Sequence, residues 1–504
     1  MEFALLKENL YKEVAVKSSS VNRPIFIIYP AEQEMQGSLY PPLGLAYISA
    51  SLKKNGYKVS VLDLSFDKEM YQVNQIQATN GIYIISFTLT LVNRVKKLID
   101  IIRTKDNSAF ILAGGPLPTV QRDKILEDFD VDLVAIGECE LRVVDIINAI
   151  QQNGDLSKIK GIIFRENDKI VITEPADYIQ NLDEVPIPDQ GSFPLDKYFE
   201  QKGYRELSIV GSRGCPYRCT FCQPILNNLF GPKVRFYSAK RVVDEMEYLV
   251  KNFKLDMIVF SDDTFAFHQQ RVIDICKEII DRKIPVMWRC QTRVGLRKDV
   301  LDYMKKAGCF LIAFGVESGS QKILDNVHKD TTVEKIKETF KYCKEVGILT
   351  HAYIMVGNLG ESEETINETI RVMKEIRPFG YNVTLTTPMP GTYLYEHAKN
   401  NDLLINEDLH DYNYIINGGQ VAKLTEFDTE ELPEIKAHLE KAISKEAEKT
   451  RDIIKLFADK NFLSKFISIL RFNPGFVVRM ARLGFRGFLK HGKGFKIVNP
   501  KTKA

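Results

Sequence analysis

Short apolar segments alternate with helix-length segments along most of the chain, and this alternation limits the folds open to it. The first 150 residues contain five such apolar segments, at residues 24–30, 59–64, 81–87, 109–115 and 131–137. Helix-length stretches such as 45–55 and 92–104 lie between them. This order predicts an α/β fold with a doubly wound, Rossmann-like parallel sheet, in which ligands bind beyond the carboxyl ends of the strands.

The same alternation resumes in the second half of the chain. Helical stretches there separate six strand candidates, at residues 207–210, 257–261, 286–290, 311–316, 350–356 and 382–386. Successive βα units of this number predict a partial (β/α)6 barrel. Active sites of barrels gather at the C-terminal ends of the strands, so polar residues that directly follow each strand become candidates for function.

Three cysteines directly follow the first strand of this predicted barrel. Cys215, Cys219 and Cys222 have the spacing Cys-x3-Cys-x2-Cys. A cubane iron–sulfur cluster takes four thiolates, so three ligands leave one iron open, and an open coordination position is typical of a metal site that does chemistry. The alternatives are buried structural cysteines or a zinc site. Zinc prefers a closed set of four ligands, and no second cysteine pair or finger-like histidine supplies it.

Composition fits a large soluble protein of two or three domains. The chain has 504 residues, of which 44% are hydrophobic and 27% charged. It shows no signal-peptide layout and no apolar run near the ~18–20 residues that span a membrane. The remaining five cysteines are scattered, which indicates a reducing cytosol rather than a disulfide framework.

Small and hydroxyl residues follow the strands of the first half. They allow a large ligand to approach the backbone closely. No Gly-x-Gly-x-x-Gly motif follows the first strand, which argues against a nicotinamide dinucleotide domain. Beyond these strands, residues 161–173 predict a hairpin, and a proline-rich segment at 181–189 follows it. We interpret 151–205 as a connector that could cover the edge between two domains.

Several of these segments resemble the cobalamin-binding domain found upstream of many radical S-adenosylmethionine (SAM) barrels. They are Tyr40-Pro-Pro-Leu-Gly-Leu-Ala-Tyr, Gly56-Tyr-Lys-Val, Ala113-Gly-Gly-Pro and Ile136-Gly-Glu. The cysteine loop, with Phe221 before its last cysteine, resembles that of the radical SAM enzymes. The resemblance covers about residues 24–400. It implies these cobalamin contacts: Pro41, Pro42, Leu43, Gly44, Ser86, Thr88, Gly114, Gly115, Pro116, Gly137 and Glu138.

One departure from the pattern concerns cobalt. Many cobalamin-binding domains carry Asp-x-His-x-x-Gly, whose histidine ligates the metal. Here the first histidine of the chain is His268, so this domain cannot supply an imidazole. We therefore predict cobalamin in a base-off, His-off form. The alternative is a Rossmann-like domain that has lost its ligand and acts only as a scaffold.

The resemblance also implies a SAM site on the barrel. Its open iron would chelate the amino and carboxylate groups of SAM, with Phe221 beside the cluster. Asp262 and Asp263 could accept hydrogen bonds from the SAM ammonium group, and Arg293 could pair with its carboxylate. Glu317 is the candidate for the ribose hydroxyls. Two further candidates are Ser318, beside Glu317, and Gly357 in the segment Met355–Glu361, which resembles the family's adenine-contact motif. Each residue alone could instead form a surface ion pair or a helix cap.

Together these features resemble the cobalamin-dependent radical SAM enzymes. We divide the chain into a leader (1–23), a cobalamin-binding domain (24–150), the connector (151–205), the barrel (206–400) and a helical C-terminal extension (401–504). The resemblance implies three cofactors, a [4Fe-4S] cluster, SAM and cobalamin, and an external electron donor of the ferredoxin or flavodoxin type. We expect SAM cleavage to a 5′-deoxyadenosyl radical and C-methylation or other carbon–carbon bond formation on a hydrophobic, lipid-like substrate. The alternatives are an anaerobic ring-forming cyclase similar to the magnesium-protoporphyrin ester cyclases, and an iron–sulfur electron-transfer or sensing protein.

The hydrophobic substrate is inferred from the tail alone. Residues 460–504 contain eleven Lys or Arg and no Asp or Glu, whereas the whole chain has a net charge of +3. Arg479, Arg482, Arg486 and Lys490 share one helical stripe among aromatic residues, which is typical of helices that lie in a membrane interface. We therefore expect a cytoplasmic protein with peripheral contact to the inner face of the membrane. The alternatives are a helical cap on the barrel and nucleic-acid binding through the positive charge, and we expect no specific nucleic acid.

Overall fold

The computed structural model describes residues 23–31, 40–77, 80–405 and 422–443, and seven residues of the tail between 463 and 475. The chain divides into two compact units. The first contains the residues up to 198 together with 228–231, and the second contains 199–227 and the residues from 232 onward. Residues 1–22 of the predicted leader (1–23) and the basic stripe beyond residue 475 lie outside the described residues.

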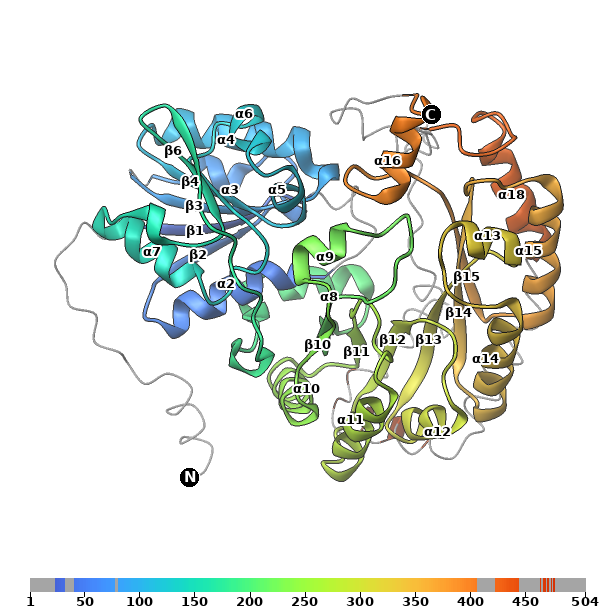
Figure 1. Ribbon diagram of the computed structural model, residues 1–504. Coiled ribbons are helices and arrows are strands. Elements are labelled where there is room, and N and C mark those ends of the chain that lie inside the picture. Colours follow the sequence, from blue (N-terminus) through green and yellow to red (C-terminus); the bar gives the residue numbers. More distant parts are fainter. Residues whose placement is uncertain are drawn as a thin grey trace. The chain divides into compact units, whose positions relative to one another are not determined.

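The first unit is built on a sheet of seven strands in the order β2-β1-β3-β4-β5-β6-β7 (Figure 1). Five strands are parallel and lie where the sequence predicts them: β1 (Ile25–Tyr29), β2 (Val59–Asp63), β3 (Ile82–Ser86), β4 (Phe110–Gly114) and β5 (Leu133–Ala135). Helices connect them, chiefly α2 (Leu43–Lys54), α4 (Val92–Lys105), α5 (Pro116–Gln121) and α7 (Val143–Gln152). Ile27, Ile84 and Leu112 of the strands are buried in a core that also contains Leu45 and Ile146 of the helices. The predicted doubly wound sheet is therefore confirmed.

The hairpin predicted in the connector is part of this sheet. Strand β6 (Ile162–Glu166) pairs antiparallel with β5, and β7 (Lys169–Ile172) pairs with β6. Ile162, Ile163 and Phe164 are buried, whereas Arg165 and Glu166 are exposed. Because β5 would otherwise be an uncovered edge, the apolar half of β6 covers it. The predicted hairpin thus extends the first sheet.

The second unit contains six parallel strands in the order β8-β11-β12-β13-β14-β15. The strands are β8 (Glu206–Ile209), β11 (Met257–Phe260), β12 (Met287–Thr292), β13 (Cys309–Glu317), β14 (Leu349–Val356) and β15 (Gly380–Leu385). The intervening helices include α10 (Ala239–Phe253), α11 (Gln269–Asp281), α12 (Lys298–Lys306), α14 (Val333–Val346) and α15 (Glu363–Ile376), and α18 (Leu432–Ile443) follows β15. No pairing joins β8 to β15 among the described residues, so the predicted partial barrel is confirmed.

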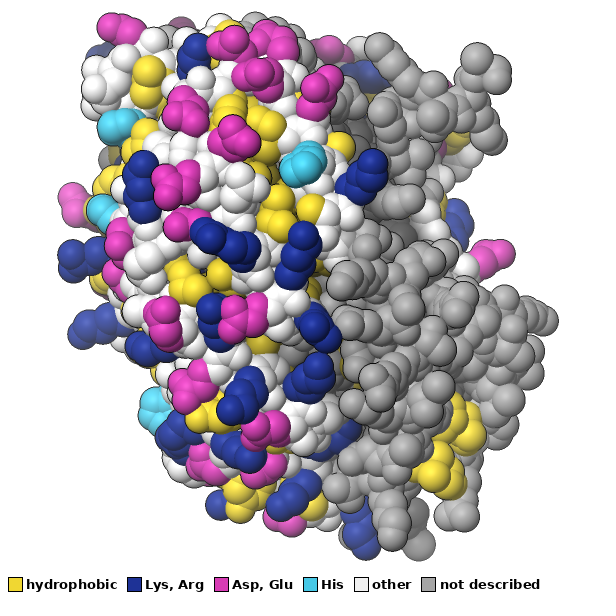
Figure 2. Space-filling view, turned by 90° about the vertical axis from the view of Figure 1, so that its right-hand side faces the viewer, with side chains coloured by type: hydrophobic (Ala, Val, Ile, Leu, Met, Phe, Trp, Pro, Cys, Tyr) yellow, Lys and Arg dark blue, Asp and Glu magenta, His cyan; other side chains and the backbone are white. Residues whose placement is uncertain are grey.

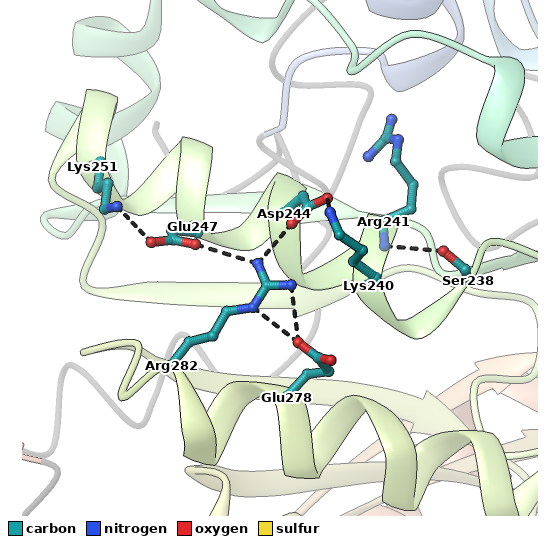
Figure 3. A network of polar contacts seen from close by, with 8 residues as sticks. All are labelled: Ser238, Lys240, Arg241, Asp244, Glu247, Lys251, Glu278 and Arg282. Carbon is teal, nitrogen blue, oxygen red and sulfur yellow. Dashed lines mark hydrogen bonds and ion pairs between the residues drawn. The ribbon is translucent and has the colours of Figure 1, made fainter. Parts of the chain in front are cut away.

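Ion pairs on the outer surface join neighbouring helices of the barrel. In Figure 3, Arg282 at the end of α11 lies between Asp244 and Glu247 of α10 and also pairs with Glu278 of its own helix. On the face drawn in Figure 2, the coloured side chains of Lys and Arg are intermixed with those of Asp and Glu, and hydrophobic groups are small. Such mixed surfaces are typical of helix faces in contact with water.

The described part of the tail packs on the N-terminal end of the barrel. Ile469 is completely buried among Tyr204, Met257, Met287 and Leu349, which lie at or near the starts of barrel strands. The side-chain amide of Asn473 donates hydrogen bonds to the Lys254 carbonyl at 2.7 Å and to Asp256 Oδ1 at 2.9 Å. These residues therefore form a cap. None of the helices that the structure describes is long and apolar enough to cross a membrane.

Candidate active site

The three predicted ligand cysteines lie in one loop that the protein holds on several sides. The loop follows β8 and the short strand β9 (Ser212–Arg213). The Cys222 amide donates to the Cys219 carbonyl at 3.0 Å, and the Thr220 amide donates to the Val327 carbonyl at 3.1 Å. Gln223 is buried, and its side-chain amide donates to the Cys215 carbonyl at 3.2 Å. The loop conformation is therefore fixed by the protein's own hydrogen bonds.

The three thiols lie close enough to influence one another. Burial, and then the neighbouring Cys219, raise the pKa of Cys222 to about 12. The pKa of Cys215 is also raised, chiefly by burial. Among the described residues, no group of three or more His, Cys, Asp or Glu side chains is arranged around one ion position. A cubane binds each thiolate through a different iron, so three cysteines of one loop can hold three irons of a cluster.

The remaining barrel cysteines take no part in this loop. Cys276, Cys290, Cys309 and Cys343 are buried in the strands and helices of the barrel. Burial raises the pKa of Cys276, Cys290 and Cys343, as is expected for inert core thiols. Cys139 of the first unit is half-buried, and burial raises its pKa to about 11.

Arg293, which directly follows β12, contacts the cysteine loop twice. Its Nη1 donates to Cys219 Sγ at 3.3 Å. Its guanidinium carbon lies 3.7 Å from the centre of the Tyr217 ring, a close cation–π contact. The Nη2 atom is buried and has no hydrogen-bond partner among the described residues. The sequence predicts a ligand contact for Arg293, but the bond to Cys219 was not foreseen.

The two neighbouring aspartates after β11 have different environments. Asp262 is buried and accepts hydrogen bonds from the Gly211 amide at 3.0 Å and from Ser212 Oγ. Burial raises its pKa. Asp263 reaches solvent and accepts only a long bond from the Gly214 amide, at 3.2 Å, among the described residues. Asp262 thus holds the turn that leads into the cysteine loop, whereas Asp263 is available to a ligand.

Although the Asp263 side chain is exposed to solvent, desolvation of its carboxyl by the surrounding protein, and then the charge of Asp262, raise the pKa of Asp263 to about 6. A carboxyl group with this pKa is still mostly ionised at pH 7, and a cationic partner would stabilise that ionised form. The environment of Asp263 therefore favours binding of an ammonium group.

Glu317 is paired with a residue that the sequence did not single out. Lys329 Nζ lies 2.7 Å from Glu317 Oε1, and both side chains are almost fully buried. A bulge at the end of β13 gives Glu317 a φ of 62°, and a Cβ on Gly315 would lie only 2.5 Å from Glu317 Oε1. Lys329 Nζ also lies 5.8 Å from the centre of the Phe221 ring. The pair therefore joins β13 to the cysteine loop.

Ser318 and Gly357 belong to two loops that other side chains shape. Ser318 is completely buried and its Oγ lies 3.1 Å from Thr369 Oγ1 of α15, so its hydroxyl already has a structural partner. The Gly357 amide donates to Glu361 Oε2 at 2.6 Å, and Gly357 has a φ of 91°. Glu361 is buried, which raises its pKa to about 7. The buried carboxylate of Glu361 holds the shape of the loop at Gly357 by accepting its amide, a role that the sequence alone did not assign.

Small and hydroxyl residues lie at the C-terminal edge of the first sheet, where several of the predicted cobalamin contacts are found. The strand order reverses between β1 and β3, the point where ligands of such sheets bind. Gly115 has a φ of 94°, and a Cβ there would lie 2.4 Å from Ser86 Oγ, so only glycine fits. A Cβ on Gly44, at the start of α2, would meet nothing within 4 Å. Thr88 and Pro116 are exposed at the same edge.

The other predicted cobalamin contacts have varied surroundings. Pro41 is buried, Pro42 precedes the first turn of α2, and Leu43 and Gly114 are half-buried. The Gly137 amide donates to Thr119 Oγ1 at 3.0 Å, and Glu138 Oε2 accepts from the Ile179 amide at 3.1 Å. A cavity of about 280 Å³ lies beside Gly137 and Glu138. Glu138 thus orders the chain after the hairpin, and its contact with cobalamin stays a prediction.

Comparisons with known proteins agree with this geometry. A family model described as the B12 binding domain matches residues 36–147, and one described as the radical SAM superfamily matches residues 209–373. The chain is 30% identical to an uncharacterized methyltransferase of Pyrococcus horikoshii, over 82% of this chain and 91% of that protein. It is 28% identical to the anaerobic magnesium-protoporphyrin IX monomethyl ester cyclase of Rubrivivax gelatinosus, over 75% of this chain and 69% of that protein.

A solved structure has the same fold. It is that of the radical SAM methyltransferase TsrM from Kitasatospora setae, with cobalamin and a [4Fe-4S] cluster bound. The TM-score is 0.65 and the sequence identity 18%, and the match covers 76% of this chain and 75% of that one.

Proposed function

Because the chain belongs to the family of radical SAM enzymes that carry an amino-terminal B12-binding domain, we propose that it methylates an unactivated carbon of its substrate. The observation that carries this proposal is the loop of Cys215, Cys219 and Cys222, whose sequence contains three cysteines and neither a fourth cysteine nor a histidine. An electron-transfer or sensing protein does not bind SAM, so it would not need polar side chains such as Asp263, Arg293 and Glu317 at the neighbouring strand ends.

The cofactors supply the reactive chemistry, and the protein's residues position it. When bound, the cluster supplies the electron that cleaves SAM to methionine and a 5′-deoxyadenosyl radical, and cobalamin supplies the methyl group. The cysteines would hold three irons. Asp263 would accept from the SAM ammonium group and Glu317 from the ribose hydroxyls, with Phe221 beside the cluster. The backbone of the loop at Gly357, which Glu361 shapes, would lie against the adenine.

Further features of the proposal concern cobalt and the electron donor. The absence of histidine before His268 supports a base-off, His-off cobalamin, because the B12-binding domain has no imidazole to offer. A ferredoxin or flavodoxin type of protein would supply electrons.

A lipid-like substrate has weaker support. Ile469 and Asn473 pack on the barrel, so this part of the tail acts as a cap. The basic stripe beyond residue 475 is the remaining reason to propose membrane contact and a lipid-like substrate. Liposome flotation of the full chain and of a chain ending at residue 475 tests it, and equal binding would contradict membrane contact through the stripe.

One experiment separates the candidate functions. We expect the anaerobically reconstituted protein to form 5′-deoxyadenosine from SAM and to transfer a labelled SAM methyl group to a product found in the parent strain and missing from a deletion strain. The Cys219→Ala variant is the control that cannot hold the full cluster. The resemblance to the cyclase of Rubrivivax gelatinosus makes ring formation the second candidate, and SAM consumption without label in the product would favour it. Failure to form 5′-deoxyadenosine would refute both.

A further inference from the structure

Arg293 touches the cysteine loop in a way that a simple ligand contact does not require. One face of its guanidinium group stacks on Tyr217, with the guanidinium carbon 3.7 Å from the ring centre. Its Nη1 points at Cys219 Sγ at 3.3 Å. Both partners belong to the loop of the ligand cysteines, whereas Arg293 follows β12, so the contact crosses from one strand end to another. The stack fixes the plane of the guanidinium group and thereby directs its N–H groups.

This contact distinguishes one thiol from the other two. Among the described residues, Cys219 is the ligand cysteine whose sulfur accepts a hydrogen bond from a cationic side chain. The Cys215 sulfur interacts with the backbone of Tyr217. Lys329 lies near Cys222, but its charge is already paired with Glu317 at 2.7 Å. Among the described residues, the direct bond between a cationic side chain and a ligand sulfur is therefore at Cys219.

A cation bonded to a ligand sulfur affects the electron affinity of an iron–sulfur cluster. Reduction potentials of such clusters depend on net charge and on hydrogen bonds to the sulfurs. Reduction adds one negative charge, and a fixed cationic donor stabilises the more negative state. A guanidinium group is a permanent cation with fixed N–H donors, which suits it to this role.

The second amino group of Arg293 gives the same side chain another possible partner. Its Nη2 is buried and has no hydrogen-bond partner among the described residues, and a buried N–H group without a partner is costly. A carboxylate is the acceptor that matches a guanidinium group best. One guanidinium group can then bind a ligand sulfur through Nη1 and an anionic ligand through Nη2.

From these contacts we infer that Arg293 sets the reduction potential of the cluster through Cys219, in addition to binding the carboxylate of SAM. This inference rests on the proposed function, because it requires the cluster. Arg293 makes the cluster easier to reduce. The carboxylate of SAM, when bound at Nη2, interacts with the same positive charge. SAM binding and cluster reduction are consequently coupled through one side chain, and such a coupling acts equally in both directions.

The test is an electrochemical titration of the anaerobically reconstituted full chain, followed by electron paramagnetic resonance. Arg293→Met removes the charge and the bond to sulfur. Arg297→Met is the matched control, because Arg297 lies four residues further along, is half exposed and pairs with Asp299 away from the cluster. We expect Arg293→Met to lower the ratio of reduced to oxidised cluster at a fixed potential by about tenfold, equal to ~59 mV for one electron. Arg297→Met should leave it unchanged.

The possible outcomes separate this inference from the proposed function. If the wild-type chain assembles no cluster, the proposed function fails. If Arg293→Met holds a full cluster with the wild-type potential, the inference is overturned and the proposed function stands. If Arg293→Met holds no cluster, the reduction potential of the Arg293→Lys variant decides. The shorter lysine loses both the stack on Tyr217 and the bond to Cys219. A wild-type potential in Arg293→Lys, or loss of the cluster there as well, would also overturn the inference.

Discussion

Replacing Lys329 by methionine tests whether the buried pair with Glu317 organises the site. The two side chains are 7% and 10% exposed, and their charged atoms are 2.7 Å apart. Methionine fills a similar volume but leaves the Glu317 carboxylate buried without its cation. Removing one partner of a buried ion pair costs about 3–5 kcal/mol, whereas replacing both partners by neutral groups costs little. We therefore expect Lys329→Met to lose about 3 kcal/mol or more of barrel stability, and the double variant Glu317→Gln/Lys329→Met to regain most of it.

The chain provides its own reporter for this measurement. Trp288 is the single tryptophan, and it is completely buried in β12. Its fluorescence during denaturant unfolding follows the barrel without interference from the first unit. Wild type, both single variants and the double variant form a double-mutant cycle, which isolates the interaction between the two side chains.

Two results would refute the reasoning. An unfolding midpoint of Lys329→Met equal to that of wild type would mean that Glu317 is solvated or has another cation. An additive double variant would mean that the pair contributes no specific interaction. The SAM affinity of the refolded variants measures a separate property, the contact of Glu317 with the ribose. Variants that contain Glu317→Gln should bind SAM more weakly even where their stability is restored.

Three further predictions concern the loops and the cap. The folded pKa of Glu361 is raised from 4.5 to about 7, so ionisation opposes folding and stability falls as pH rises through that window. Glu361→Gln should remove this fall, with a difference on the order of 3 kcal/mol above pH 7 and almost none below pH 4, measured by Trp288 fluorescence; parallel pH profiles would contradict it. Asp262→Asn should reduce the iron content after reconstitution because it disturbs the bonds to Gly211 and Ser212, whereas Asp263→Asn should keep the iron and weaken SAM binding; equal effects on both readouts would refute the division of roles. A chain ending at residue 459 should lose about 2 kcal/mol of barrel stability with Ile469, whereas a chain ending at 475 should match the full chain; equal stability of the two would show that Ile469 does not cap the barrel.

The sequence predicted the strands of both sheets because each is a short apolar run between turn or helix signals. The sequence also predicted a hairpin near 162–172, but not its position in the sheet. That position depends on the pairing of β6 with β5, which only the tertiary structure shows. The same hairpin signal is compatible with a free connector or with an added sheet edge. The choice is made by tertiary pairing.

The site was predictable to the extent that its residues follow strands directly. Asp262 and Asp263 both follow β11, and only the fold shows that Asp262 is buried against Gly211 and Ser212 whereas Asp263 is exposed. Lys329 could not be found in that way. It is twelve residues from Glu317, and their contact depends on the left-handed backbone at Glu317. Arg293 and Cys219 are 74 residues apart, so only the barrel brings them together.

These contacts make the cysteine loop the meeting point of several strand ends. Asp262 after β11 holds the turn before the loop, Arg293 after β12 bonds to Cys219, and Val327 beyond β13 accepts the Thr220 amide. These bonds are all formed by the protein's own groups and favour a preformed loop for the cluster. A preformed loop reduces the entropy lost when cofactors bind, and it fixes the distances between reacting groups, on which radical chemistry depends. The residues outside the Cys-x3-Cys-x2-Cys motif therefore determine how precisely the three cysteines are positioned for the cluster.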